Sequence, residues 1–134
     1  MGLAVTDILT FDGFMKHWAE DRPERMALQE GDRRYSYAEL EERSAKVASM
    51  LLATGLQKGD RIAWIGKNSD LYFTLFYGAA RAGMVMVPIG WRLAVAEWGF
   101  IANDTGAKIL FTGEGFEGAG EALKGQVQRL ERII

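Results

Sequence analysis

The spacing of apolar residues over the first fifty positions predicts two helices separated by a β-hairpin. The first helix is amphipathic and is expected to end before Pro23. Strand-forming runs at residues 26–29 and 33–36 flank a polar turn that contains glycine. Ser36 and Glu39 form a capping box that begins the second helix. The apolar positions of the first helix are Phe11, Phe14, Met15 and Trp18.

The middle of the chain alternates apolar runs with turns, as an α/β sheet requires. Residues 62–65 and 84–87 are continuous apolar runs, the pattern of strands covered on both faces. The helix predicted over residues 70–82 begins at Ser69, ends at Gly83 and is apolar nearly all round, so we expect it to be largely buried. The other features predicted are the end of the second strand at Pro88, a helix at 94–102, a loop at 103–106 and a strand at 108–111.

The C-terminal segment, residues 113–134, predicts a loose glycine-rich loop at 113–120, a helix at 121–130 and the beginning of a strand at 131–134. Strands that alternate with crossover helices imply right-handed connections in one sheet. The predicted fold class is therefore α/β, with a doubly wound, mostly parallel sheet, crossover helices and a short N-terminal β-hairpin. We expect residues 1–134 to form a single α/β subdomain.

Composition narrows the classes of function. The 134 residues carry a formal net charge of −2, which gives no reason to expect nucleic-acid binding. The sequence has no cysteine, so thiol catalysis is excluded, and His17 alone defines no metal site. No apolar run approaches about 18 residues, so we expect no transmembrane segment and a cytoplasmic location. Residues 1–6 fit the N-myristoylation pattern, which is too short to establish the modification.

Residues 113–118 form a GxGxxG pattern directly after a predicted strand, the context of a dinucleotide fingerprint. The carboxylates of Glu114 and Glu117 would crowd a phosphate there, and further glycines weaken the helix whose N-terminus would face it. We interpret this segment as a flexible surface loop.

Trp91 and Arg92 follow a predicted strand at its carboxyl end, where open α/β sheets place ligands. They are the candidate substrate-binding residues, although we favour a structural role in which Arg92 anchors the loop to Asp104 or Glu97. We identify no catalytic residue and no metal site. The aromatic residues of the helix at 70–82 are interpreted as core, or as a contact with a missing layer, in preference to a ligand pocket; they are Tyr72, Phe73, Phe76 and Tyr77.

Short motifs occur in a fixed order between Phe14 and Phe111. They are Tyr35-Ser36-Tyr37-Ala38-Glu39-Leu40, Gly59-Asp60-Arg61-Ile62-Ala63, Asn68-Ser69, Ala79-Ala80-Arg81-Ala82-Gly83, Val87-Pro88, Arg92-Leu93 and Asn103-Asp104-Thr105-Gly106-Ala107-Lys108. The ordered set closely resembles the N-terminal part of the acyl-adenylate-forming enzymes, the AMP-dependent acid–CoA ligase family. One departure is Gly90, where that family commonly has Asn.

The resemblance implies an enzyme that activates a carboxylic acid, fatty or aryl, with ATP and Mg²⁺ as an acyl-adenylate and then transfers the acyl group to CoA. It also implies that the catalytic motifs lie downstream of Ile134, so that this chain is the truncated first subdomain of a larger enzyme. We therefore expect a scaffold that binds no cofactor itself and has the remainder of the parent enzyme as its partner. Uncovered apolar faces favour self-association, in particular through the Ile133-Ile134 end.

Two alternatives remain open. The first is a standalone binding or regulatory module that has the same fold and no catalytic activity. The second is a dinucleotide-binding protein, which rests on residues 113–118 alone.

Overall fold

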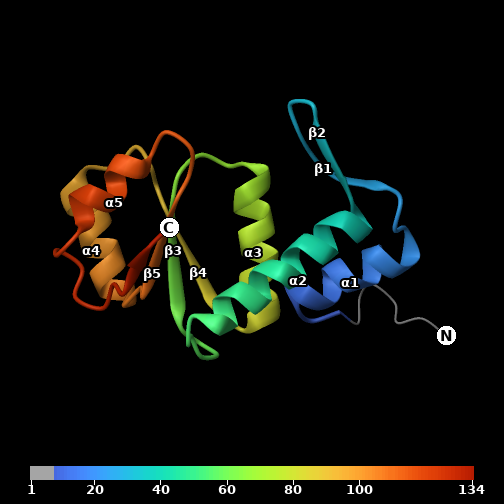
Figure 1. Ribbon diagram of the computed structural model, residues 1–134, viewed down its shortest axis with the longest axis horizontal. Helices are drawn as coiled ribbons and strands as arrows, with labels where there is room; N and C mark the ends of the chain where they lie inside the picture. The colour runs from blue at the N-terminus through green and yellow to red at the C-terminus, as the bar shows by residue number, and fades with distance from the viewer. Residues whose placement is uncertain (1–7) are drawn as a thin grey trace.

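The computed structural model describes residues 8–134, so the N-myristoylation pattern at residues 1–6 lies outside the described residues. An antiparallel hairpin, β1–β2, stands apart from a parallel sheet with the strand order β4-β3-β5-β6 (Figure 1). In chain order the elements are α1 (Phe11–Asp21), β1 (Met26–Glu30), β2 (Arg33–Ser36), α2 (Tyr37–Ala53), β3 (Arg61–Ile65), α3 (Asp70–Ala82), β4 (Val85–Ile89), α4 (Val95–Thr105), β5 (Ile109–Thr112), α5 (Glu117–Leu123) and β6 (Arg132–Ile133).

The parallel sheet is doubly wound. β3 comes first in the chain and lies between β4 and β5, so the crossovers that follow it run in opposite directions. Right-handed crossovers in opposite directions place their helices on opposite faces, with α3 on one side of the sheet and α4 and α5 on the other (Figure 1). The fold class predicted from the sequence is confirmed.

The side chains of β3 alternate between two packed cores, one on each face of the sheet. Ile62 and Trp64 belong to the core beneath α2 and α3. Ala63 and Ile65 belong to the core beneath α4 and α5. Because both faces of this central strand are covered, the run carries no polar residue between Ile62 and Ile65.

Local capping sets the boundaries of α2 and α3 where the sequence predicted them. Ser36 Oγ accepts from the Glu39 amide over 3.2 Å, and the Ser36 amide donates to Glu39 Oε2 over 2.7 Å. Ser69 Oγ accepts from the amide of Tyr72 over 3.1 Å. Gly83 ends α3 in the left-handed conformation, with φ of 76°.

The expectation that α3 is buried nearly all round is only partly correct. Leu71 is 53% exposed and Phe73 is 36% exposed, so the first turn of the helix is partly open to solvent. Further along the helix, α3 packs closely on α2, where a Cβ added at Gly78 would collide with Val47. The close approach of the two helices explains the glycine.

The second strand of the sheet differs from its prediction in length and in burial. Pro88 was expected to end it, but it lies within β4, which continues to Ile89. β4 is an edge strand, and Val85 is 48% exposed. The Val85 amide donates to the carbonyl of Asp60, directly before β3, so by alternation the nitrogen of position 88 faces the open edge. Proline is tolerated there because no ladder hydrogen bond is lost.

Helix α4 is longer than predicted at its C-terminal end. The residues expected to form a loop at 103–106 are the last turn of the helix together with Gly106, its left-handed cap, with φ of 65°. The polar sequence of this turn is compatible with a helix end because Asn103 and Thr105 both have hydrogen-bond partners. Asn103, for example, donates to the carbonyl of Gln126 over 2.9 Å.

Helix α5 lies earlier in the chain than predicted, at residues 117–123 in place of 121–130. Glycine weakens a helix, but at Gly120 it is required by packing, since an added Cβ would lie 2.5 Å from Cγ2 of Ile133 on β6. Gly125, with φ of 77°, lies in the turns that follow. The strand begun at 131–134 is observed as β6.

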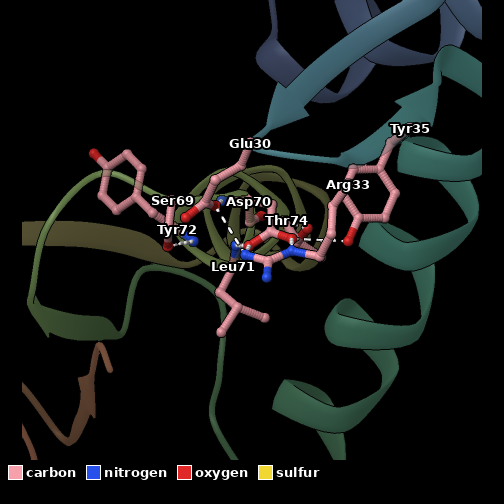
Figure 2. A network of polar contacts seen from close by, with 8 residues as sticks. All are labelled: Glu30, Arg33, Tyr35, Ser69, Asp70, Leu71, Tyr72 and Thr74. Atoms are coloured by element: carbon pink, nitrogen blue, oxygen red, sulfur yellow. Dashed lines mark hydrogen bonds and ion pairs between the residues drawn. The ribbon is translucent and has the colours of Figure 1, made fainter. Parts of the chain in front are cut away.

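A polar latch formed by Asp70, Arg33, Tyr35 and Glu30 joins the hairpin to the N-terminus of α3 (Figure 2). Asp70 is only 3% exposed, and its Oδ2 accepts from Arg33 Nε over 2.7 Å and from the Tyr35 hydroxyl over 2.8 Å. The backbone amide of Asp70 donates to Glu30 Oε2 over 2.5 Å. Glu30, Arg33 and Tyr35 of the hairpin therefore all bond to Asp70, the first residue of α3.

The latch keeps the Asp70 carboxylate ionised. Burial acts to raise the pKa of Asp70, but the hydrogen bonds from Arg33 and Tyr35 outweigh it and lower that pKa to about 2. The same bond to Asp70 raises the pKa of the Tyr35 hydroxyl. A buried carboxylate that is fully hydrogen-bonded stabilises the docked hairpin.

Candidate functional site

The loops that follow β3, β4 and β5 meet at the carboxyl edge of the sheet. In doubly wound sheets this edge holds the ligand, at the point where the strand order reverses. Here the reversal lies between β3 and β5. The chain leaves β3 toward α3 on one face of the sheet and leaves β5 toward α5 on the other (Figure 1).

Two glycines allow the loops after β3 and β5 to touch. The amide of Gly113 donates to the carbonyl of Ile65 over 2.9 Å. A Cβ added at Gly66 would lie 2.9 Å from the Cα of Gly113 and 3.0 Å from Cζ2 of Trp64. No side chain fits between these backbones, so glycine is required at position 66 by space and not by its dihedral angles.

Trp91 is the centre of a cluster of aromatic and cationic side chains at this edge. Its ring meets the ring of Phe116 edge to face, with centroids 5.7 Å apart. The guanidinium carbon of Arg92 lies 4.3 Å from the Trp91 centroid, and Lys67 Nζ lies 5.5 Å from it. Trp91 is half-buried, whereas Arg92 and Lys67 are exposed. Two cations on one indole are stabilised by its negative π face and remain accessible to an anion.

The predicted site residues Trp91 and Arg92 are therefore neighbours, but Arg92 does not have its predicted structural partners. Within residues 8–134, no ion pair joins Arg92 to Asp104 or Glu97. Glu97 is instead engaged with the helix terminus, where its Oε2 accepts from the amide of Ala94 over 2.8 Å. The favoured anchoring role for Arg92 is wrong, because stacking on Trp91 replaces the expected ion pair.

Sequence reasoning missed Lys67 and Phe116 as members of the cluster. Each lies a few residues beyond the end of a strand, as Trp91 does. Their position after strands was a usable signal, but which loops meet depends on the strand order. The order β4-β3-β5 places the loop of Lys67 between those of Trp91 and Phe116.

The GxGxxG segment at 113–118 lies at the reversal point, but it closes on itself. Gly115 has φ of 81°, and its amide donates to Glu117 Oε1 over 3.1 Å. Backbone hydrogen bonds from Glu117 itself and from Gly115 lower the pKa of the Glu117 carboxyl. The amide that a phosphate would need is thus occupied by a carboxylate of the same loop. Residues 117 and 118 belong to α5, so the expected flexible loop is shorter than predicted.

The aromatic residues of α3 pack against each other and against α1. Tyr72 stacks on Phe76 with centroids 6.5 Å apart, and Phe11 meets Phe76 edge to face at 5.0 Å. Tyr77 alone of the four lines a cavity of about 610 Å³ between the start of α1 and α3. Burial raises the pKa of the Tyr77 hydroxyl. None of the four side chains is fully buried, and of them Tyr72 packs against the core beneath α2 and α3, so the interpretation as core is only partly correct.

The donor set of the described part of the chain does not fit a metal centre. No group of three or more His, Cys, Asp or Glu side chains comes together within residues 8–134. A divalent cation such as Mg²⁺ requires several oxygen ligands, so we assign no metal-dependent step to these residues. Over the same range, no helix combines the length and the apolar character that a membrane span needs.

A family model described as AMP-binding enzyme matches residues 15–133. Fatty acid–[acyl-carrier-protein] ligase ScoC of Streptomyces coeruleorubidus is 37% identical over 98 residues, 73% of this chain and 19% of that protein. Long-chain-fatty-acid–CoA ligase FadD13 of Mycobacterium tuberculosis is 44% identical over 82 residues, 61% of this chain and 16% of that protein. This chain therefore spans less than a fifth of the length of these curated relatives.

Solved structures agree with the sequence relatives. The N-terminal domain of FACL13 from M. tuberculosis has a TM-score of 0.88 and 32% identity, covering 95% of this chain and 34% of that chain. A fatty acyl CoA synthetase of the same organism has a TM-score of 0.88 and 33% identity over 93% of this chain. Since the family model covers most of the residues, the chain belongs to the AMP-binding enzyme family.

Proposed function

We propose that this chain is the N-terminal scaffold subdomain of an acid–CoA ligase, in which residues 1–134 form a single α/β subdomain. The parent enzyme activates a carboxylic acid with ATP and Mg²⁺ as an acyl-adenylate and transfers the acyl group to CoA. The observation that carries this proposal is the family match over residues 15–133. Relatives named for fatty, ferulic and benzoic acids support a fatty or aryl acid as substrate.

Within the parent, we assign the chain a positioning role and no catalytic group. It presents a rigid sheet edge whose loops are set by packed glycines, while Mg²⁺ and the reacting groups are held by other parts of the enzyme. The isolated chain binds no cofactor tightly. In the cytoplasm, where ATP and CoA are available, its partner is the remainder of the parent enzyme. Nucleic acid is not a partner, in keeping with the net charge of −2.

At the carboxyl edge, Trp91 and Arg92 contact an anionic part of the ligand. Arg92 is exposed and stacked on Trp91, which restrains its guanidinium without neutralising it. Lys67 adds a second positive charge on the same ring. A planar guanidinium binds phosphate oxygens in pairs, so a phosphate-bearing substrate such as ATP or CoA fits this cluster best.

The proposal is tested with the complete gene and with the isolated chain. A ligase that contains this segment should release pyrophosphate from ATP only when its acid substrate is present, and the isolated chain should release none. Arg92→Ala in the complete enzyme should raise the KM for the phosphate-bearing substrate about tenfold, the effect of losing one charge-assisted contact. Pyrophosphate release by the isolated chain would contradict the scaffold role. A KM unchanged by Arg92→Ala would contradict the ligand contact proposed for Arg92.

Two arms of the experiment separate the remaining possibilities. Assays with CoA and with an acyl carrier protein identify the thiol acceptor, since one relative is named for each. Sequencing the gene beyond codon 134 discriminates the standalone module from the ligase. A downstream phosphate-binding loop supports the ligase, whereas a stop codon directly after Ile134 supports the module.

A further inference from the structure

The carbonyl of Gly90 receives two hydrogen bonds at the point where the chain leaves β4. The amide of Leu93 donates to it over 3.1 Å, a local turn within the loop. The indole Nε1 of Trp98 donates to it over 2.9 Å from eight residues away, in the first turns of α4. The second bond therefore joins the loop to the helix that follows it.

The indole that makes this bond is itself held in place. Trp98 is half-buried and packs on the core beneath α4 and α5, together with Trp91. An aromatic side chain restrained by packing keeps its N–H direction fixed, so the hydrogen bond constrains the loop and not the indole. The donor stands on a regular helix, which is the most rigid support available beside this loop.

Gly90 places little restriction of its own on the loop. Its φ lies outside the left-handed region, and an added Cβ would meet only Leu93, at 3.4 and 3.5 Å. A side chain would fit there, yet glycine leaves the backbone free to sample many conformations. The hydrogen bond from Trp98 limits this freedom at Gly90 itself, while Phe116 and Lys67 contact the loop through the ring of Trp91.

We propose that Trp98 is a positioning residue, whose indole N–H holds the Gly90 carbonyl and thereby sets the placement of Trp91 and Arg92. Rotation about the peptide after Gly90 moves Trp91 directly, and Arg92 follows because it is stacked on that ring. This tether, the hydrogen bond from Trp98 Nε1 to the Gly90 carbonyl, is argued from geometry alone. Its consequence for ligand binding rests on the proposed function of the carboxyl edge.

The first test is hydrogen exchange by NMR on the 134-residue chain. Trp98→Phe removes the donor and keeps most of the aromatic body, so amides 92–94 should exchange about fivefold faster, as expected for one lost hydrogen bond. Trp18→Phe is the matched control, because Trp18 lies in α1 and packs on Tyr37, far from the loop after β4. It should leave the exchange of amides 92–94 within twofold of the wild type.

A second variant separates loss of the tether from loss of packing. Gly90→Ala has room for its methyl group and restricts the unbonded loop, so in the Trp98→Phe background it should restore part of the protection at amides 92–94. Unchanged exchange in Trp98→Phe overturns the tether. Uniformly faster exchange across the chain, without rescue by Gly90→Ala, also overturns it, because it indicates a general packing role.

The second readout is kinetic and uses the complete ligase. Trp98→Phe should raise the KM for the phosphate-bearing substrate severalfold and leave kcat within twofold, because the residue orients a binding loop and touches no reacting atom. If Arg92→Ala raises KM and Trp98→Phe does not, the positioning role is wrong. If neither variant changes KM while exchange at 92–94 increases, the tether holds and the ligand-binding role proposed for the edge fails.

Discussion

Arg33 Nε lies 2.7 Å from Oδ2 of Asp70, a bond between residues 37 positions apart that fixes the hairpin on α3. Asp70 is buried, whereas the side chain of Arg33 is 58% exposed. The carboxylate therefore depends on this contact more than the guanidinium does, because only the carboxylate has lost its water. The contacts of the latch drawn in Figure 2 should therefore contribute measurably to the free energy of unfolding.

Asp70→Asn should lower the free energy of unfolding by about 2 kcal/mol, since it replaces charge-assisted hydrogen bonds with neutral ones at a buried position. Urea unfolding followed by circular dichroism measures the change. Glu42→Gln is the control, because the Glu42–Lys46 pair is exposed on both sides and should contribute less than about 0.5 kcal/mol. Equal effects of the two substitutions would show that the latch contributes no more than a surface pair.

The contribution of Asp70 should depend on pH in the acid range. Burial raises its pKa, the bonds from Arg33 and Tyr35 lower it more, and the result is about 2. The folded pKa is below the unfolded value of about 3.9, so the stabilisation is complete above about pH 4 and is lost as pH falls toward 2.

Linkage gives this contribution a size of about 2 kcal/mol. Unfolding of the wild type and of Asp70→Asn at pH 6 and at pH 2.5 measures it. The difference in stability between the two proteins should shrink at the lower pH. A difference that stays constant between these pH values would contradict the lowered pKa of Asp70.

Gly66→Ala should destabilise the carboxyl edge by about 1–3 kcal/mol, because its methyl group would press on the Gly113 backbone and on Trp64. Gly118→Ala is the matched control in α5, where an added Cβ meets nothing within 4 Å. It should stabilise the protein by up to about 1 kcal/mol through helix propensity. Thermal unfolding of both variants tests the contrast. Equal shifts in Tm would show that the strand-end contact is not close-packed.

The outer edge of β6 should promote self-association. Among residues 8–134, β6 pairs with β5 alone, and Ile134 beside it is 50% exposed. An open edge with apolar ends pairs with other strands, and a lysine there opposes pairing. Sedimentation at increasing concentration should show reversible oligomers of the wild type that decrease in Ile134→Lys.

Phe100→Lys is the control for self-association, because Phe100 is 70% exposed on α4 away from that edge. It should leave the oligomers of the wild type in place. A monomer at all concentrations would contradict the prediction, and an equal effect of the two lysines would place the contact elsewhere.

The starts of α2 and α3 could be predicted because their determinants are local. The Ser36–Glu39 capping box and the Ser69 cap each join residues three positions apart, so the pattern in the sequence and the bond in the structure are nearly the same information. Motif order was sufficient for the family as well. Predictions failed where packing overrode local preference, as at Gly120, which is required by contact with Ile133 although it weakens α5.

The sequence by itself determined the element types, the parallel α/β class, the family and the position of Trp91 and Arg92 after a strand. Only the tertiary structure decided that β4 is an edge strand able to contain Pro88, that Lys67 and Phe116 join Trp91, and that Asp70 receives the hairpin. The physical reason is the separation along the chain between the residues that interact. Caps and apolar periodicity act within a few residues, whereas these contacts join loops and elements that the strand order brings together.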